Sequence, residues 1–532
     1  MAYYTLHAYD ADVWVREFRG LNQADESLNN DPMYASEEWN VETPGGVLQP
    51  QAAMRMLADH EDWETNRVET LAVLHRRWYQ GAGSNEWYIA CAGGKFYQKQ
   101  KGAGTWMPIT LPSGITAYQS SAWSWVTYEI PDESDPTKTI DVLLMSNAVD
   151  GMIMVIPPER PRTWGDVKTM TWGDVKTMTW GELLSPVWQI HAIDTEGYKF
   201  GVIERYAERI WGSALLDDPD ALVYSRPYDP TDWTAAGADE QPEDGAGIIH
   251  QPSWDGDRFY ALLAFGDQLI AFKRNRVWRI MGTNPGEFNL QEQFGGGTSC
   301  YATIAKDAER VYMAGVDGLS TYDGMTVSPW WRAQIAKVWR TVNLNAIDQI
   351  CGVMYKHRYY LSIPTGDSAV NNAVMVCNLE EGTVLFYKGM QIEAFLPTND
   401  ALFATSSSLP GSILEIRYDS WVDGAADGKA TKWMSPWMDF GYKRIVKGGF
   451  DLYFTPEVQE EAVTLIFRIE TEKKTKTKQY TVEPSEKEHR NKRLHFSGAG
   501  RRFRLIIETE DGVTAPWRLI GGIQLVVETD AD

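Results

Sequence analysis

The chain has 532 residues, a formal net charge of −23 and four widely spaced cysteines, Cys91, Cys300, Cys351 and Cys377. Overall acidity argues against wrapping nucleic acid, which needs clustered lysine and arginine. The cysteine spacing argues against a zinc site and fits buried thiols of a protein made in a reducing cytoplasm. Frequent Trp, Tyr, Gly and Pro favour an all-β fold of two or three domains.

Residues 1–60 read as an extended N-terminal segment that joins the following domain. Turn residues are frequent in it, and strand-like runs are short. A helix is expected near 51–60, where Ala52, Met56 and Leu57 would share one face. The N-terminus lacks the features of a secretion signal, and no run approaches 18 apolar residues, so we expect no membrane insertion by this chain.

Residues 61–418 contain short alternating apolar runs separated by glycine turns, the pattern of successive β-hairpins. The runs at 140–147 and 152–156, for example, flank an Asp150-Gly151 turn. The hairpins recur at near-regular spacing, which predicts a β-propeller of about 5–7 blades.

A tandem repeat occupies residues 163–183. The sequence Thr-Trp-Gly-Asp-Val-Lys-Thr-Met at 163–170 recurs at 171–178, and a truncated copy starts at Thr179. The period is too short for a solenoid unit. The repeat is therefore either an expanded surface loop or a loop whose Trp164, Trp172 and Trp180 pack on a neighbouring subunit.

The polar residues 419–432 predict a linker, and 433–532 predict a C-terminal β-sandwich. Lysine and arginine crowd 473–504, although the rest of the chain is acidic. The candidate interface residues there are Lys473, Lys474, Arg501 and Arg502. They form a solvated face, a DNA contact, or a dock for an acidic partner such as the propeller of a neighbouring copy.

The sequence offers no catalytic, cofactor-binding or metal-binding constellation. The nucleotide-binding, zinc-protease and hydrolase motifs are absent, and the histidines are scattered. Two acidic groups could in principle hydrolyse a glycoside, and a third could bind calcium: Asp217-Asp218 with Asp220, Asp255 with Asp257, and Asp317 with Asp323. Neighbouring Gly and Pro make turn roles the better interpretation of all three groups. Trp330 and Trp331 are candidates for glycan stacking, and more readily for a core or a subunit interface.

Several short phrases, in a specific order, resemble the β-propeller tail proteins of tailed bacteriophages. They are Phe-Arg-Gly-Leu-Asn at 18–22, Asn-Val at 40–41, Gly-Gly-Val-Leu at 45–48, Glu-Arg-Ile-Trp at 208–211, Leu-Val-Tyr-Ser at 222–225, Asp-Pro-Thr-Asp-Trp at 229–233, Leu-Ile-Ala-Phe-Lys at 269–273, Gly-Leu-Ser-Thr-Tyr-Asp-Gly at 318–324 and Trp-Met-Asp-Phe-Gly at 437–441. One departure is Gln49-Pro50-Gln51, which stands where the family often has a basic phrase.

The resemblance implies a non-enzymatic virion structural protein, made in the host bacterial cytoplasm and assembled into the phage tail as a nozzle, hub or head–tail closure component. Such proteins form rings, here expected to hold about six copies, around the DNA channel. The implied partners are further copies, neighbouring tail or connector proteins, and DNA that passes without specific binding. An acidic lumen would suit that passage. The alternatives are a receptor-recognition tail protein that binds a host-surface glycan and a propeller glycosidase or lyase, which would need a central carboxylate pair with one raised pKa.

Overall fold

The structure, a computed structural model, describes residues 11–24, 31–59, 63, 66–77, 83–131, 137–158, 188–252, 256–409, 411–439, 447–484 and 491–529. Strands dominate these residues, and the α-helices among them, α4 (Ala336–Trp339) and α5 (Ser420–Asp423), have four residues each. The tandem repeat falls outside the described residues, and so do Trp164, Trp172 and Trp180.

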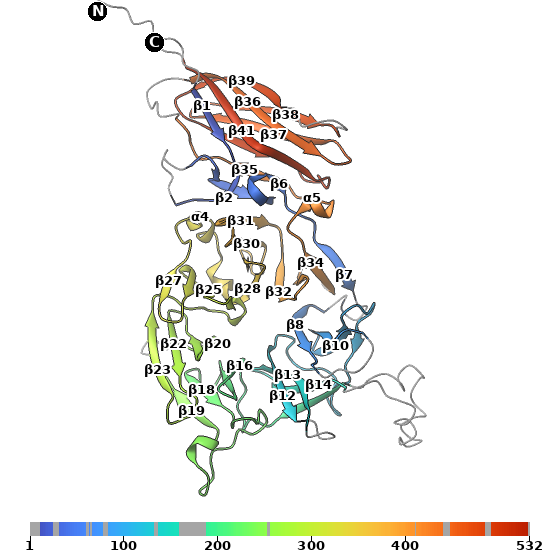
Figure 1. Cartoon of the computed structure of the whole chain (residues 1–532), viewed down its shortest axis with the longest axis vertical. Helices are drawn as coiled ribbons and strands as arrows, with labels where there is room; N and C mark the ends of the chain where they lie inside the picture. Colours follow the sequence, from blue (N-terminus) through green and yellow to red (C-terminus); the bar gives the residue numbers. More distant parts are fainter. Residues whose placement is uncertain are drawn as a thin grey trace, which may run out of the picture.

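Seven four-stranded antiparallel sheets follow one another around a ring in the described chain, which confirms the all-β propeller followed by a sandwich (Figure 1). The first four blades are β8 (Val68–His75), β9 (Glu86–Ala92), β10 (Lys95–Gln100) and β11 (Met107–Pro108); β12 (Ser124–Pro131), β13 (Thr139–Asn147), β14 (Gly151–Ile156) and β15 (Gln189–Ile193); β16 (Val202–Tyr206), β17 (Arg209–Ser213), β18 (Ala221–Tyr224) and β19 (Gly247–His250); and β20 (Ala261–Phe265), β21 (Gln268–Phe272), β22 (Arg276–Met281) and β23 (Asn289–Phe294).

The other three blades are β24 (Ala305–Lys306), β25 (Val311–Gly315), β26 (Gly318–Tyr322) and β27 (Val327–Pro329); β28 (Cys351–Tyr355), β29 (Arg358–Ile363), β30 (Ala373–Asn378) and β31 (Thr383–Lys388); and β32 (Ile392–Pro397), β33 (Leu402–Ser406), β34 (Ser412–Ile416) and β7 (Arg55–Asp59). Each gap between neighbouring blades has its own apolar core, including the gap between the seventh and first blades, where Leu396 and Ile413 meet Trp63 and Tyr88. The middle strands are covered on both faces, so their sequences read as continuous apolar runs.

Strand β7 closes the propeller from the N-terminal side. It runs antiparallel to β34 and supplies the outer strand of the seventh blade. The helix expected near 51–60 is therefore wrong. The spacing that suggested it has another cause: Ala52 is buried in a bridge with Ala426, whereas Met56 and Leu57 lie on the outer strand and are partly exposed. Pairing with the free edge of β34 overrides the weak local helical pattern.

The sandwich contains the first and the last strand of the described chain. One sheet has the order β1 (Ala11–Val15), β41 (Trp517–Thr529), β36 (Lys447–Val458), β39 (Lys492–Gly500); the other has the order β38 (Thr475–Val482), β37 (Val463–Thr471), β40 (Phe503–Glu508), β35 (Lys432–Met434), β4 (Glu37–Trp39). Residues 1–60 thus divide between the domains, because β7 joins the propeller while β1 and β4 complete the sandwich. One apolar core fills the space between the two sheets.

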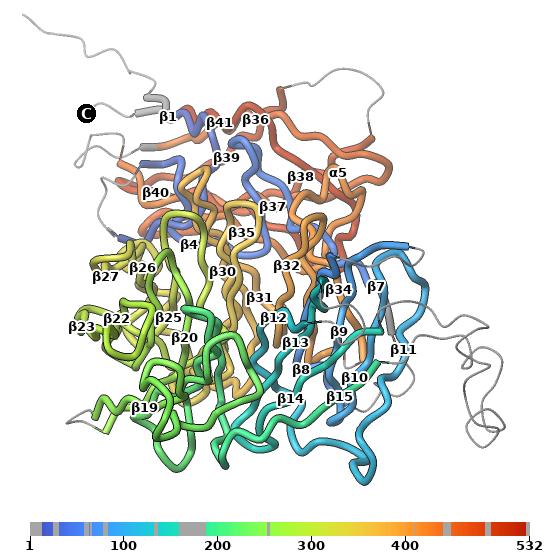
Figure 2. The backbone as a smooth tube through the Cα atoms, turned by 60° about the horizontal axis from the view of Figure 1, so that its bottom comes forward, coloured from blue at the N-terminus to red at the C-terminus, as the bar shows by residue number. Residues whose placement is uncertain are grey.

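Short N-terminal strands lie between the two domains. Strand β2 (Arg19–Leu21) pairs with β3 (Tyr34–Ala35), and β5 (Val41–Glu42) pairs with β6 (Gln49–Pro50). Figures 1 and 2 show the sandwich at the rim of the propeller, beside the sixth and seventh blades. The molecule is elongated, with the third blade at the end opposite the sandwich (Figure 1).

Candidate functional site

Residues 18–22 contact both domains and form the junction between them. Phe18 lies in the sandwich core with its ring edge-on to Trp433, their centroids 5.1 Å apart. Leu21 lies instead in the core between the fifth and sixth blades. Between them, Gly20 lies against β31 so closely that a Cβ would stand 2.2 Å from the carbonyl oxygen of Val384. The Phe-Arg-Gly-Leu phrase therefore has a structural role at the domain junction, and only glycine permits this approach.

Asn40 connects the sandwich, the sixth blade and the linker. Its backbone is left-handed, with φ +57°, and its N–H donates to the Phe386 carbonyl at 2.9 Å. Its side-chain oxygen accepts from the Lys388 amide at 2.7 Å, and its side-chain nitrogen donates to the Ala430 carbonyl at 2.8 Å. Asparagine combines tolerance of this conformation with a donor and an acceptor, which explains the residue type here.

Substitution of Asn40 should weaken the junction. Asn40→Ala removes both side-chain hydrogen bonds and places alanine at a positive φ, so we expect a loss of about 2 kcal/mol in the free energy of unfolding. Asn40→Gly keeps the backbone conformation and should cost less. Urea unfolding followed by tryptophan fluorescence measures both. Equal losses for the two variants would show that the positive φ contributes nothing.

Two further contacts tie the N-terminal segment to the sixth blade. Glu42, 1% exposed, pairs with Arg358 at 3.3 Å and accepts a hydrogen bond from the Tyr387 hydroxyl. The Gly45 amide donates to the Glu381 carboxylate at 3.0 Å. All three N-terminal phrases that carry the family resemblance therefore lie at this junction or beside it.

The departure from the family at Gln49-Pro50-Gln51 fits this packing. Gln49 and Gln51 are each 2% exposed, and the Gln49 amide donates to the Asp419 carboxylate at 2.9 Å. The Gln51 amide lies against the Met390 sulfur, and a basic side chain buried there would carry a desolvation cost that a neutral amide avoids.

A pocket of about 490 Å³ opens where the domains meet. Its walls include the Trp39, Phe386 and Trp437 rings, and Glu38 lies at its side. Glu38 is 2% exposed, and neither of its carboxyl oxygens has a hydrogen-bond partner among the described residues. Burial, and after it the nearby Glu42 carboxylate, raises its pKa well above the usual range. The buried carboxyl and the aromatic walls suit a hydroxyl-rich ligand.

The inner strands of the propeller line a central channel with a pocket of about 280 Å³. Glu69, Glu204 and Glu393 face it, and burial raises the pKa of each. Glu393 forms an ion pair with Arg67 at 3.0 Å. The channel thus holds the acidic groups that a glycosidase needs, but that alternative requires a pair with only one raised pKa, and the pocket volume lies below the usual range for ligand pockets.

Glu204 predicts a pH dependence of stability. Burial raises its pKa from 4.5 to about 7. The folded chain binds this proton more tightly than the unfolded chain, so the stabilisation is fully present below pH 4.5 and is lost as the pH rises through 7. Glu204→Gln should flatten the fall in melting temperature between pH 5 and 8, whereas exposed Glu309→Gln should not. An unchanged slope in Glu204→Gln would contradict this role.

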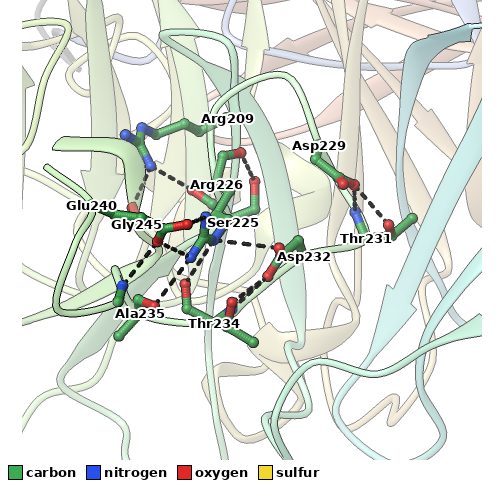
Figure 3. A network of polar contacts seen from close by, with 11 residues as sticks. Arg209, Ser225, Arg226, Asp229, Thr231, Asp232, Thr234, Ala235, Glu240 and Gly245 are labelled. Carbon is green, nitrogen blue, oxygen red and sulfur yellow. Dashed lines mark hydrogen bonds and ion pairs between the residues drawn. The ribbon is translucent and has the colours of Figure 1, made fainter. Parts of the chain in front are cut away.

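The third blade carries a long loop, residues 225–246, between β18 and β19, and Arg209 holds it in place (Figure 3). Arg209 is 1% exposed. Its guanidinium donates to the Ser225 carbonyl at 2.7 Å, to the Gly245 carbonyl at 2.8 Å and to the Glu243 carbonyl. The arginine of the Glu-Arg-Ile-Trp phrase thus joins the two ends of the loop.

The Asp-Pro-Thr-Asp-Trp phrase builds two side-chain turns in the same loop. Asp229 accepts from the Thr231 amide at 2.8 Å and its hydroxyl at 2.7 Å, and Asp232 accepts from Thr234 in the same way (Figure 3). Trp233, 5% exposed, packs against Phe200 in the core between the second and third blades. These residues shape a surface loop with its own hydrogen bonds.

The structure brings together the four predicted basic interface residues. Lys473 and Lys474 lie in the turn after β37, and Arg501 and Arg502 lie in the turn before β40. Glu472 links the turns, because its carboxylate accepts from the Arg501 amide at 3.1 Å and the Arg502 amide at 2.8 Å. All four basic residues are exposed. This basic end of the sandwich is the end at which β41 terminates, since Gly448 pairs with both Ala499 and Glu528.

Trp330 and Trp331 form a stacked pair, with centroids 4.8 Å apart. Trp330 also meets Tyr312 at 4.9 Å and Tyr359 at 5.9 Å, and both tryptophans are partly buried against the core between the fifth and sixth blades. Their packing is intramolecular in the described chain, so they offer only part of their surface to a glycan or a neighbour.

Four of the acidic residues weighed for catalysis or calcium make local contacts. Asp218 pairs with His250 and Asp220 with buried Lys273, each at 2.7 Å. Asp257 accepts from a backbone amide, Asp323 caps its own turn, and Asp255 lies outside the described residues. Within the described ranges, no three His, Cys, Asp or Glu side chains are grouped to hold a metal ion. Across the same residues, no helix has the length and hydropathy to cross a membrane.

The sequence matches no protein-family model and no curated protein. Similar solved structures include the Pan2 WD40 domain of Neurospora crassa, 8% identical over 70% of this chain and 96% of that domain, with a TM-score of 0.35. A chain of the mitotic checkpoint complex is 10% identical over 68% of this chain and 98% of its own, with a TM-score of 0.33.

The extracellular domain of a putative one-component system from B. thetaiotaomicron is 9% identical over 86% of this chain, with a TM-score of 0.40, and this chain covers 59% of it. These likenesses concern the propeller fold and say nothing about function. The chain is a seven-bladed β-propeller joined to a β-sandwich that both of its ends complete.

Proposed function

We propose that this protein is a non-enzymatic structural component of a bacteriophage tail and forms a ring around the DNA channel, as a nozzle, hub or head–tail closure piece. One observation carries the proposal: the N-terminal phrases that resemble the phage tail proteins lie together at the junction between propeller and sandwich. Contacts at this junction hold the two domains together as one unit. A ring subunit needs such a unit to transmit mechanical load between its neighbours.

The distribution of charge agrees with the proposed role. Residues 433–532 contain equal numbers of basic and acidic side chains, so the formal charge of −23 lies on residues 1–432. An acidic propeller would let DNA pass without trapping it. The protein would reside in the virion, with neighbouring copies and tail or connector proteins as partners.

Mass photometry and negative-stain microscopy of the purified chain test the proposal. A ring of about six copies with a central hole is the expected result. A chain that stays monomeric at all accessible concentrations and also fails to join purified tail or connector rings would contradict it. A glycan array on such a monomer would test the receptor-binding alternative, for which the junction pocket is the candidate site.

The channel carboxyls are the observation that favours a glycosidase as a second candidate. Two features oppose it: the small channel volume and the ion pair that Arg67 makes with Glu393. Release of reducing sugar from a glycan by the purified chain, lost in Glu393→Gln at an unchanged melting temperature, would favour the enzyme. No release from either protein would leave the structural role in place.

A further inference from the structure

The third-blade loop is an acidic surface held in one conformation. Residues 226–246, here called the acidic loop, contain six acidic side chains and one basic one. The basic one, Arg226, is occupied within the loop, since it pairs with Glu240 at 2.6 Å and with Asp232 at 3.3 Å (Figure 3). The Arg209 bonds and the two aspartate turns order the backbone before any partner arrives, which lowers the entropic cost of binding.

The acidic loop also presents free surface. Asp239, Glu243 and Asp244 are exposed. Tyr228 of the same loop is 74% exposed and has a left-handed backbone with φ +62°, and its amide donates to the Glu208 carbonyl at 2.8 Å. An exposed aromatic side chain on an ordered loop supplies apolar contact area of the kind that centres protein interfaces.

The basic end of the sandwich has the opposite character. Lys473, Lys474, Arg501 and Arg502 project from two turns that Glu472 holds side by side. The chain has a net charge of −23, so two copies repel each other over most of their surfaces. The basic end of one copy can instead attract an acidic surface of a second copy.

The two surfaces lie at opposite ends of the molecule, the acidic loop beyond β19 and the basic end where β41 terminates (Figure 1). One copy cannot join its own two ends in this arrangement. Two different patches on each copy define a head-to-tail contact, and such contacts close into rings or extend into filaments.

We propose that the acidic loop of one copy docks onto the basic end of the sandwich of the next copy. The inference rests on the proposed function, because it names the partner surface by which the ring is built. Since charge drives the contact, assembly should weaken as ionic strength rises.

Two full-length variants, each disabled at one end, test the docking directly. The first carries K473E, K474E, R501E and R502E; the second carries D239K, E243K and D244K. Each variant alone should be monomeric by mass photometry. A one-to-one mixture should assemble again, with a dissociation constant at least tenfold below that of either variant alone. The intact loop of the first variant meets the intact basic end of the second, and the two charge-reversed surfaces also complement each other. A chain that carries both sets has exchanged charges at both ends and should assemble again.

A matched control places charge reversals at exposed positions elsewhere in the propeller, with K95E, R310E and R340E, and should assemble like the wild type. Circular dichroism and melting temperature confirm that each variant folds. Wild-type rings that persist in both single-end variants, or a mixture that stays monomeric, would overturn the docking while leaving the ring proposal intact. Assembly of the mixture combined with only open filaments in the wild type would support the docking and overturn the channel ring.

Discussion

Replacing Trp433 with alanine should lower the free energy of unfolding of the sandwich by about 3–5 kcal/mol. Trp433 is fully buried in β35 and packs edge-on against Phe18. Its removal leaves a cavity where the N-terminal segment enters the sandwich core. Because β1 and β4 complete the two sheets, the loss should also loosen the hold of the N-terminal segment on the sixth blade.

Urea unfolding followed by circular dichroism measures the loss in Trp433→Ala, and limited proteolysis locates it. The matched control is Trp14→Ala, because Trp14 lies in the same sandwich on β1 but is 53% exposed. The control should cost less than about 1 kcal/mol. Equal costs for the two variants would contradict the assignment of Trp433 to the shared core.

The contrast between these tryptophans shows where prediction from the sequence ends. Both stand in alternating apolar runs, and nothing local tells a core tryptophan from a surface one. What separates them is pairing across the whole chain: Ala11 of β1 lies opposite Val527 of β41. No local pattern encodes a contact over that distance, so the division of residues 1–60 between two domains could not be predicted.

The propeller was predictable because its signals are local. Each blade consists of neighbouring hairpins, and turns such as Asp150-Gly151 mark them in the sequence. The closing strand β7 gave no such signal. Its partner β34 is more than 350 residues away, and its own apolar spacing suggested a helix. The blade count depends on this closure and could only be bounded.

In the candidate sites, too, some features can be predicted from the sequence and others depend on contacts between distant parts of the chain. The cluster of lysine and arginine in 473–504 was visible in the composition, yet only the fold shows that Glu472 joins its two turns. The close approach of Gly20 to Val384 was invisible, because it depends on β31 of a distant blade. The excess of aspartate and glutamate at 226–246 is a signal in the sequence for a surface loop, but only the fold shows that Arg209 joins the ends of this loop.

Arg209→Leu should release the acidic loop and, through it, prevent assembly. Burial lowers the pKa of Arg209, so the guanidinium is held in place at a desolvation cost that its three carbonyl bonds offset. Leucine fills much of the volume but leaves the carbonyls of Ser225, Glu243 and Gly245 without this donor. An orphaned buried acceptor costs about 1–3 kcal/mol, and because part of the loop can reach water we expect a total loss of about 3 kcal/mol.

Three measurements separate the parts of this prediction. Thermal unfolding should show the loss of stability, limited proteolysis should cut within 225–246 in the variant first, and mass photometry should show fewer assembled copies. Arg226→Leu is the matched control, since Arg226 lies in the same loop but its bonds to Glu240 and to the Thr234 and Ala235 carbonyls lie nearer the surface, so its removal should lower the melting temperature less. A loop that is cut quickly in Arg209→Leu while assembly stays at the wild-type level would show that Arg209 orders the loop, and would contradict its role in docking.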